Sequence, residues 1–87
     1  MRPIGFEWDD ANLDHIARHE YALEEIEEVF TGEYLVRRSR GERYLAYGQT
    51  AAGRYTVVVY ERRPKGMIRV ATARDMNRAE RARFRRR

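Results

Sequence analysis

The spacing of apolar residues divides the first half of the chain into one strand-like and two helix-like stretches. Residues 4–8 alternate apolar side chains with small or polar ones, which is typical of a short strand. Two stretches then repeat apolar residues three and four positions apart, as one face of a helix does, and they are Ala11–Glu20 and Ala22–Phe30. The second helix is expected to end at Thr31-Gly32, because glycine commonly follows a helix C-terminus.

The second half of the chain has the pattern of strands separated by turns. Turns are expected at 37–41, 49–53 and 62–66, and the predicted strands are Tyr34–Val36, Glu42–Gly48, Arg54–Glu61 and Met67–Ala73. Residues 55–60 are apolar on both faces, which predicts a central strand covered on each side. In the last strand, Ile68, Val70 and Thr72 are expected to share a face. A final helix is predicted over Asp75–Phe84, with Asn77 and Glu80 at the spacing of a capping box.

This order of elements predicts an α+β domain with a short N-terminal strand, two helices, an antiparallel sheet and a C-terminal helix. A chain of 87 residues is expected to form a single domain over residues 1–87. Its 43% hydrophobic content indicates a folded protein, and the absence of cysteine excludes disulfides and thiolate chemistry. No stretch is long and apolar enough for a membrane span or a signal peptide, so we expect a cytoplasmic protein with no membrane partner.

Charge is strongly segregated along the chain. Residues 1–33 hold two basic and ten acidic side chains, a net charge of −8, whereas residues 34–87 hold sixteen basic and four acidic ones, a net charge of +12. All but one of the basic residues are arginine, whose planar fork binds phosphate through paired hydrogen bonds. We therefore expect a basic sheet that faces nucleic acid or an acidic protein, with the acidic second helix lying away from it.

The two histidines, His15 and His19, lie one turn apart on the first predicted helix. They are open to a structural role, to acid–base catalysis, or to metal binding, but no third metal ligand accompanies them and no metal site is expected. His19 is the preferred acid–base candidate because it ends the helix beside Arg18. Two carboxylates, Glu42 and Glu61, are each flanked by arginines, which is compatible with a surface ion pair or with a base kept ionised.

An ordered set of short motifs resembles the BrnT family of toxins over nearly the whole chain. The motifs are Phe6-Glu7-Trp8-Asp9, Asn12, His15, Arg18-His19, 25–30, Gly41-Glu42-Arg43, Gly53-Arg54, 57–60, 68–74, Glu80-Arg81 and Phe84. The chain departs from the family pattern at Glu20-Tyr21 and at Thr72-Ala73-Arg74. The resemblance implies a RelE-like ribonuclease toxin and a neighbouring antitoxin, expected to be of the ribbon-helix-helix type. It also implies that this antitoxin binds and blocks the toxin and represses the operon, so that operator DNA is contacted only through the antitoxin.

Metal-independent RNA cleavage needs a proton acceptor, positive groups that hold the phosphorane, and a proton donor. We expect no cofactor, and we expect the catalytic groups to be His19, Arg43, Arg54, Glu61 and Arg74. The groups expected to contact RNA are Tyr47, Tyr60 and Arg69, the tyrosines by stacking on bases. The alternative is a non-catalytic module of the same fold that binds nucleic acid or protein.

Overall fold

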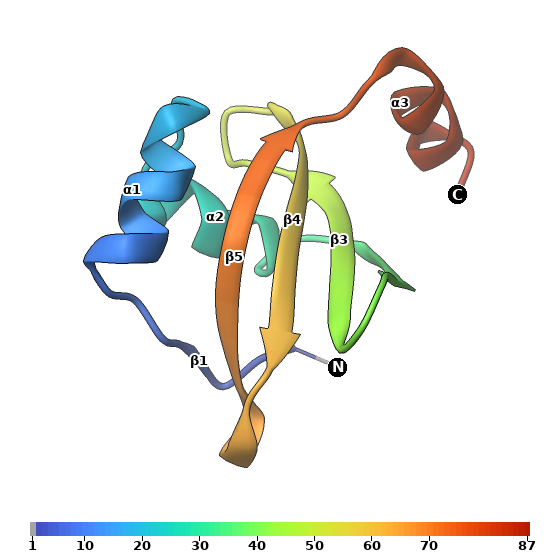
Figure 1. The fold of residues 1–87 in the computed structure, drawn as a ribbon. Coiled ribbons are helices and arrows are strands. Elements are labelled where there is room, and N and C mark those ends of the chain that lie inside the picture. The colour runs from blue at the N-terminus through green and yellow to red at the C-terminus, as the bar shows by residue number, and fades with distance from the viewer. Residues whose placement is uncertain (1) are drawn as a thin grey trace.

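A five-stranded sheet lies between two groups of helices in the computed structural model, which describes residues 2–87 (Figure 1). The elements in chain order are β1 (Gly5–Phe6), α1 (Asp10–Arg18), α2 (Leu23–Val29), β2 (Leu35–Arg38), β3 (Arg43–Gln49), β4 (Tyr55–Arg62), the short 3-10 helix η1 (Pro64–Gly66), β5 (Met67–Asp75) and α3 (Arg78–Arg85). The predicted α+β class and order of elements are therefore confirmed.

The strands follow the order β1-β5-β4-β3-β2, with β4 at the centre. Strands β2 to β5 are antiparallel, but β1 pairs in parallel with β5 through Gly5↔Met67 and Phe6↔Ile68, so the sheet is not antiparallel throughout. Because β1 has only two residues, it covers only the start of the outer edge of β5. Helix α1 packs along the rest of that strand.

Apolar side chains cover both faces of β4. On one face, Ile16 of α1 and Ile26 of α2 pack in a buried cluster with Val58. On the other face, Phe84 of α3 packs in a second cluster with Val57. The run of residues that is apolar on both faces is therefore the central strand, as the pattern predicted. Figure 1 shows α1 and α2 on one side of the sheet and α3 on the other.

A β-bulge interrupts the pairing of β4 with β5. Val59 pairs with Thr72 and Tyr60 pairs with Val70, so Ala71 is an extra residue in β5. Val70 faces the buried α1/α2 side, whereas Thr72 lies opposite Val59 on the α3 side. The expectation that Ile68, Val70 and Thr72 share a face is wrong, because the alternation of side chains restarts at the bulge.

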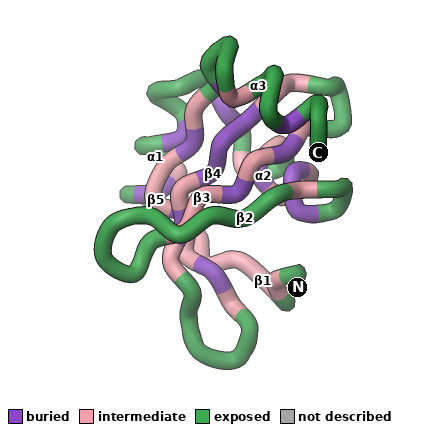
Figure 2. The backbone as a smooth tube through the Cα atoms, turned by 90° about the vertical axis from the view of Figure 1, so that its right-hand side faces the viewer, coloured by how far each residue is buried: buried purple, intermediate pink, exposed green. Residues whose placement is uncertain are grey.

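Several bounds differ from the sequence pattern, and strand β2 and helix α3 are the clearest cases. Strand β2 continues through Arg37 and Arg38, where a turn was expected, and Figure 2 shows that it is exposed along its length. Helix α3 begins only at Arg78, after the cap residue Asn77, whose Oδ1 accepts from the Glu80 N–H at 2.8 Å. Glu80 Oε1 accepts from the Asn77 N–H at 2.9 Å, which confirms the capping box.

None of the helices in residues 2–87 has the length and apolar composition that crossing a bilayer requires.

Candidate active site

Three charged side chains form a row across the α3-facing side of the sheet. Arg43 at the start of β3 pairs in register with Glu61 on β4, and Glu61 pairs in register with Arg69 on β5. The Arg43 Nε lies 3.6 Å from Glu61 Oε2. The bulge at Ala71 brings Arg69 to this face, because Arg69 lies five positions before Arg74 and a regular strand would place the two on opposite faces. A carboxylate therefore sits between two arginines.

Helix α1 packs along β5, at the end of this row that Arg69 occupies. Together, the helix and the row form a hollow of about 250 Å³. The wall from α1 includes Asn12 and His15, and the sheet contributes Arg43, Glu61 and Arg69. Buried Ile16 holds the helix against the sheet, while His15, one residue earlier, is exposed toward the hollow. The hollow therefore joins an imidazole, a carboxylate and two guanidinium groups.

The N-terminus of α1 is tied to Arg69. Asp9 caps the helix by accepting from the Asn12 N–H at 3.0 Å, and buried Asn12 donates from Nδ2 to the Glu7 carbonyl at 2.8 Å. The second carboxylate oxygen of Asp9 accepts from Arg69 Nη1 at 2.6 Å. This hydrogen bond from Arg69 holds the pKa of Asp9 below its usual value. Asp9 thus orients Arg69 at the edge of the hollow as well as starting the helix.

This arrangement provides each group that metal-independent phosphodiester cleavage requires. The Arg43 contact with Glu61 is longer than a hydrogen bond, so most of the five guanidinium N–H donors of Arg43 remain for a phosphate. Glu61 is 40% exposed in its side chain and is open to a ligand. Carboxylate and imidazole are both proton-transfer groups. Within residues 2–87, no three histidine, aspartate or glutamate side chains are grouped so that they could hold a metal ion.

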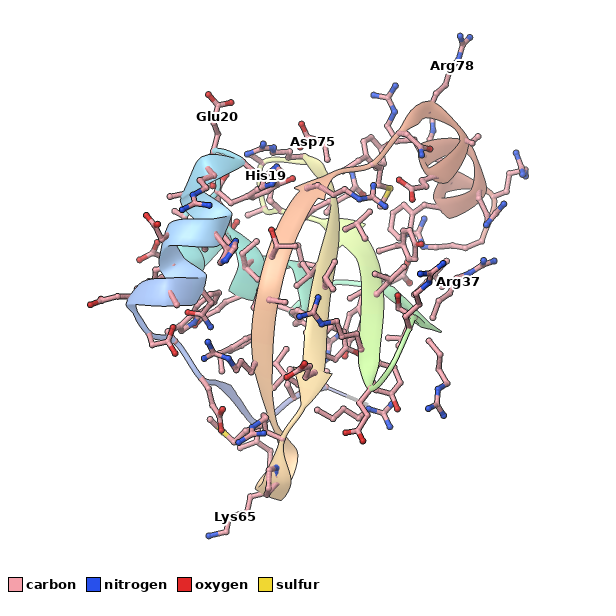
Figure 3. All side chains as sticks on the ribbon, in the orientation of Figure 1. His19, Glu20, Arg37, Lys65, Asp75 and Arg78 are labelled. Carbon is pink, nitrogen blue, oxygen red and sulfur yellow. The ribbon has the colours of Figure 1, made fainter. Side chains whose placement is uncertain are left out.

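Arg54 and His19 lie at the opposite end of the sheet, near the start of β4 and the end of β5. Arg54 donates to Asp75 Oδ1 at 2.8 Å, to the Glu20 carbonyl at 2.8 Å and to the His19 carbonyl at 3.1 Å. Its guanidinium carbon stacks 3.6 Å from the ring centroid of Tyr21. Figure 3 shows His19 and Asp75 together at this end of the molecule. The structure therefore does not bring Arg54 or His19 to the hollow.

Arg74 shares a face with Arg43 but is bound to α3. Its Nη1 and Nη2 donate to the two carboxylate oxygens of Glu80 at 2.7 and 2.9 Å. The hydrogen bonds from Arg74 are the main cause that lowers the pKa of Glu80. Because Glu80 belongs to the capping box, Arg74 links the end of β5 to the start of α3. Arg43, Arg54 and Arg74, each expected to be catalytic, therefore have separate partners, Glu61, Asp75 and Glu80, and do not meet in one hollow.

The two tyrosines expected to stack on bases have different environments. Tyr60 is 5% exposed and packs against Phe30 in the α1/α2 core, so its ring is not available at the surface. Burial raises the pKa of Tyr60. Tyr47 is half-buried under α3 and borders a second hollow beside β2. Tyr47 alone of the two reaches the surface that the sheet arginines share.

The sequence analysis preferred His19 to His15 as the acid–base candidate, but His15 is the histidine at the hollow. Its spacing of three residues from Asn12 places the two on one helix face, but the choice between His15 and His19 depends on which end of α1 lies beside the charged strands. The second missed contact, Asp9 with Arg69, joins residues 60 positions apart. The expectation that the acidic helix lies away from the strand arginines is confirmed for α2, which packs on the face opposite to Arg43, Arg69 and Arg74.

Comparison with known families adds an independent finding. A family model described as the ribonuclease toxin BrnT of type II toxin–antitoxin systems matches residues 8–80, a span that includes every residue of the hollow. A search of curated protein sequences found no match.

Proposed function

The chain belongs to the BrnT family of ribonuclease toxins of type II toxin–antitoxin systems, and from this membership we propose that it cleaves RNA without a metal ion at the hollow beside α1. One observation carries the assignment: Glu61 lies between Arg43 and Arg69 on adjacent strands, at a hollow that His15 also lines. Of the groups expected to be catalytic, the proposal retains Arg43 and Glu61, leaves out Arg54 and Arg74, and replaces His19 with His15. Arg69, which was expected to contact RNA, takes a catalytic role.

The proposed reaction is an in-line attack of a ribose 2′-oxygen on the adjacent phosphorus. Glu61 accepts the 2′-hydroxyl proton, the bond to the 5′-oxygen breaks, and His15 donates a proton to that leaving oxygen. Arg43 and Arg69 donate hydrogen bonds to the non-bridging oxygens, where negative charge grows in the phosphorane. The products are a 2′,3′-cyclic phosphate and a free 5′-hydroxyl, so atoms and charge balance without a co-reactant.

The family implies an antitoxin partner and an RNA target. We propose that a cognate antitoxin of ribbon-helix-helix type neutralises this chain and that the chain contacts operator DNA only through it. The arginine-rich side of the sheet supports an acidic partner surface. We propose the cytoplasm as the place of action because the substrate is cellular RNA.

The test is RNA cleavage by purified protein, with and without chelator, followed by analysis of the product ends. Wild-type protein is expected to leave 2′,3′-cyclic phosphate ends in both conditions. Arg43→Ala, Arg69→Ala, Glu61→Gln and His15→Ala should each lower the cleavage rate by about 10²–10³-fold while the melting curve stays cooperative. The matched controls are His19→Ala and Arg78→Ala, and Figure 3 shows Arg78 pointing into solvent from α3.

Two outcomes would contradict the proposal in different ways. Cleavage that stops on addition of chelator would exclude the metal-independent mechanism. RNA binding that the arginine substitutions weaken, with no cleavage by the wild type, would leave a non-catalytic nucleic-acid-binding module of the same fold.

A further inference from the structure

The outer edge of β2 presents unpaired backbone groups. β2 is the last strand of the sheet and pairs only with β3. The Ser39 N–H donates to the Arg43 carbonyl at 2.8 Å, so by the alternation of an antiparallel ladder Arg37 also bonds to β3. The N–H and C=O groups of Val36 and Arg38 then point away from the sheet. In Figure 2 no other described part of the chain lies in front of this edge.

Apolar side chains accompany this open edge. Leu35 is 38% and Val36 is 43% exposed, and they are two of the three large apolar residues exposed among residues 2–87. Beside Leu35, a hollow of about 340 Å³ lies between β2 and α3, with Tyr47 and Phe84 in its lining. An open edge that carries exposed apolar side chains is the kind of surface to which another extended segment adds.

Charge around the edge selects the occupant. Arg37 and Arg38 lie on β2, and the α3 side of the hollow adds Arg83 and Arg86. The two nearby carboxylates are already engaged, Glu33 by Arg87 at 2.8 Å and Glu80 by Arg74. A second copy of this chain paired edge to edge would bring two sets of these arginines close together, and like charges repel. An acidic segment, by contrast, would neutralise them.

We propose that an extended acidic segment of the antitoxin adds to the sheet as a sixth strand along β2. Its backbone bonds to the outward N–H and C=O groups of Val36 and Arg38, its apolar side chains cover Leu35 and Val36, and its carboxylates pair with the surrounding arginines. This inference rests on the proposed function only for the identity of the partner. The β2 edge lies across the sheet from the β5 edge, where α1 and Arg69 form the active-site hollow. The added strand is therefore an anchor that does not itself occupy the hollow.

The direct test is hydrogen–deuterium exchange of the wild-type protein, free and in complex with the antitoxin co-expressed from the neighbouring gene. The segment containing Val36 and Arg38 should exchange rapidly in the free protein and become protected in the complex. A Val36→Pro variant removes the outward N–H and places a ring where the added strand must approach, while β3 does not use that N–H. It should weaken the complex by at least about tenfold in Kd. Val36→Ala, which keeps the N–H, should lose less.

Charge and catalysis supply separate readouts. Arg38→Glu should weaken the complex and reduce its dependence on salt. The free Val36→Pro variant should cleave RNA at the wild-type rate. If neither the wild type nor any variant cleaves RNA, the result counts against the proposed function and not against the added strand. Unchanged exchange at Val36 and Arg38 in a stable complex would overturn the inference. So would protection of this segment in a dimer of the free protein, which would identify a second copy as the occupant.

Discussion

Arg54 is expected to stabilise the fold and to leave RNA cleavage unaffected, and Arg54→Ala tests this. The side chain is 29% exposed and joins the end of β5, through Asp75, to the carbonyls of His19 and Glu20 in the link between α1 and α2. Glu20 has a φ of 64°, a left-handed conformation that costs energy for a residue other than glycine. Arg54 holds this link in place.

The expected cost of Arg54→Ala follows from these contacts. The two hydrogen bonds to carbonyls contribute about 1 kcal/mol each at most, because water partly replaces them once the side chain is removed. The ion pair contributes up to about 1 kcal/mol, since the Asp75 side chain is 64% exposed. Stacking on Tyr21 adds about 0.5–1 kcal/mol. After discounting for solvent, we expect the free energy of unfolding to fall by about 2 kcal/mol, and Tm to fall by roughly 8–16 °C in a domain of this size.

The assay is thermal and urea unfolding of Arg54→Ala, Arg54→Lys and the control Arg78→Ala, with RNA cleavage measured well below each Tm. Lysine keeps the charge but lacks the fork that reaches three acceptors, so its Tm should lie between those of alanine and wild type. Arg78→Ala should match wild type. A Tm of Arg54→Ala within about 3 °C of wild type, together with lost cleavage, would refute the structural role and support the earlier expectation that Arg54 is catalytic.

Two further predictions concern the pH dependence of stability. Burial raises the pKa of Tyr21 to about 12, so its neutral form contributes stability that is complete below pH 10 and is lost as pH rises from 10 to 12. Tyr21→Phe should remove that loss, about 2–3 kcal/mol in the wild type, and alkaline unfolding curves of the two proteins provide the comparison. Hydrogen bonds from Arg74 lower the pKa of Glu80. The stability that the ionised carboxylate contributes is therefore complete above about pH 4.5 and is lost as pH falls through the lowered pKa. Glu80→Gln keeps a capping-box side chain and should cost about 1–2 kcal/mol at pH 7 and less at pH 3; an equal cost at both values would contradict the ion-pair explanation.

Local patterns along the chain were sufficient to predict most elements. Residues 55–60 are apolar on both faces, and such a strand buries all of its apolar side chains only at the centre of a sheet that is covered on both sides. Asn77 and Glu80 specify a helix start through bonds between near neighbours, so this capping box needs no tertiary information. The family resemblance likewise depends on an ordered set of motifs, and the match over residues 8–80 agrees with it.

The tertiary structure decided which charged residues meet. The seventeen arginines are chemically alike in the sequence, and their roles depend on partners such as Asp75 for Arg54, Glu80 for Arg74 and Glu61 for Arg43. The bulge at Ala71 reverses the face on which every later residue of β5 lies. A bulge arises from the register between two strands, which the alternation of side chains along one strand does not reveal. The packing of α1 on β5 decides between His15 and His19, since the two lie one turn apart, with His19 at the C-cap of α1, and they differ in what the sheet places beside them.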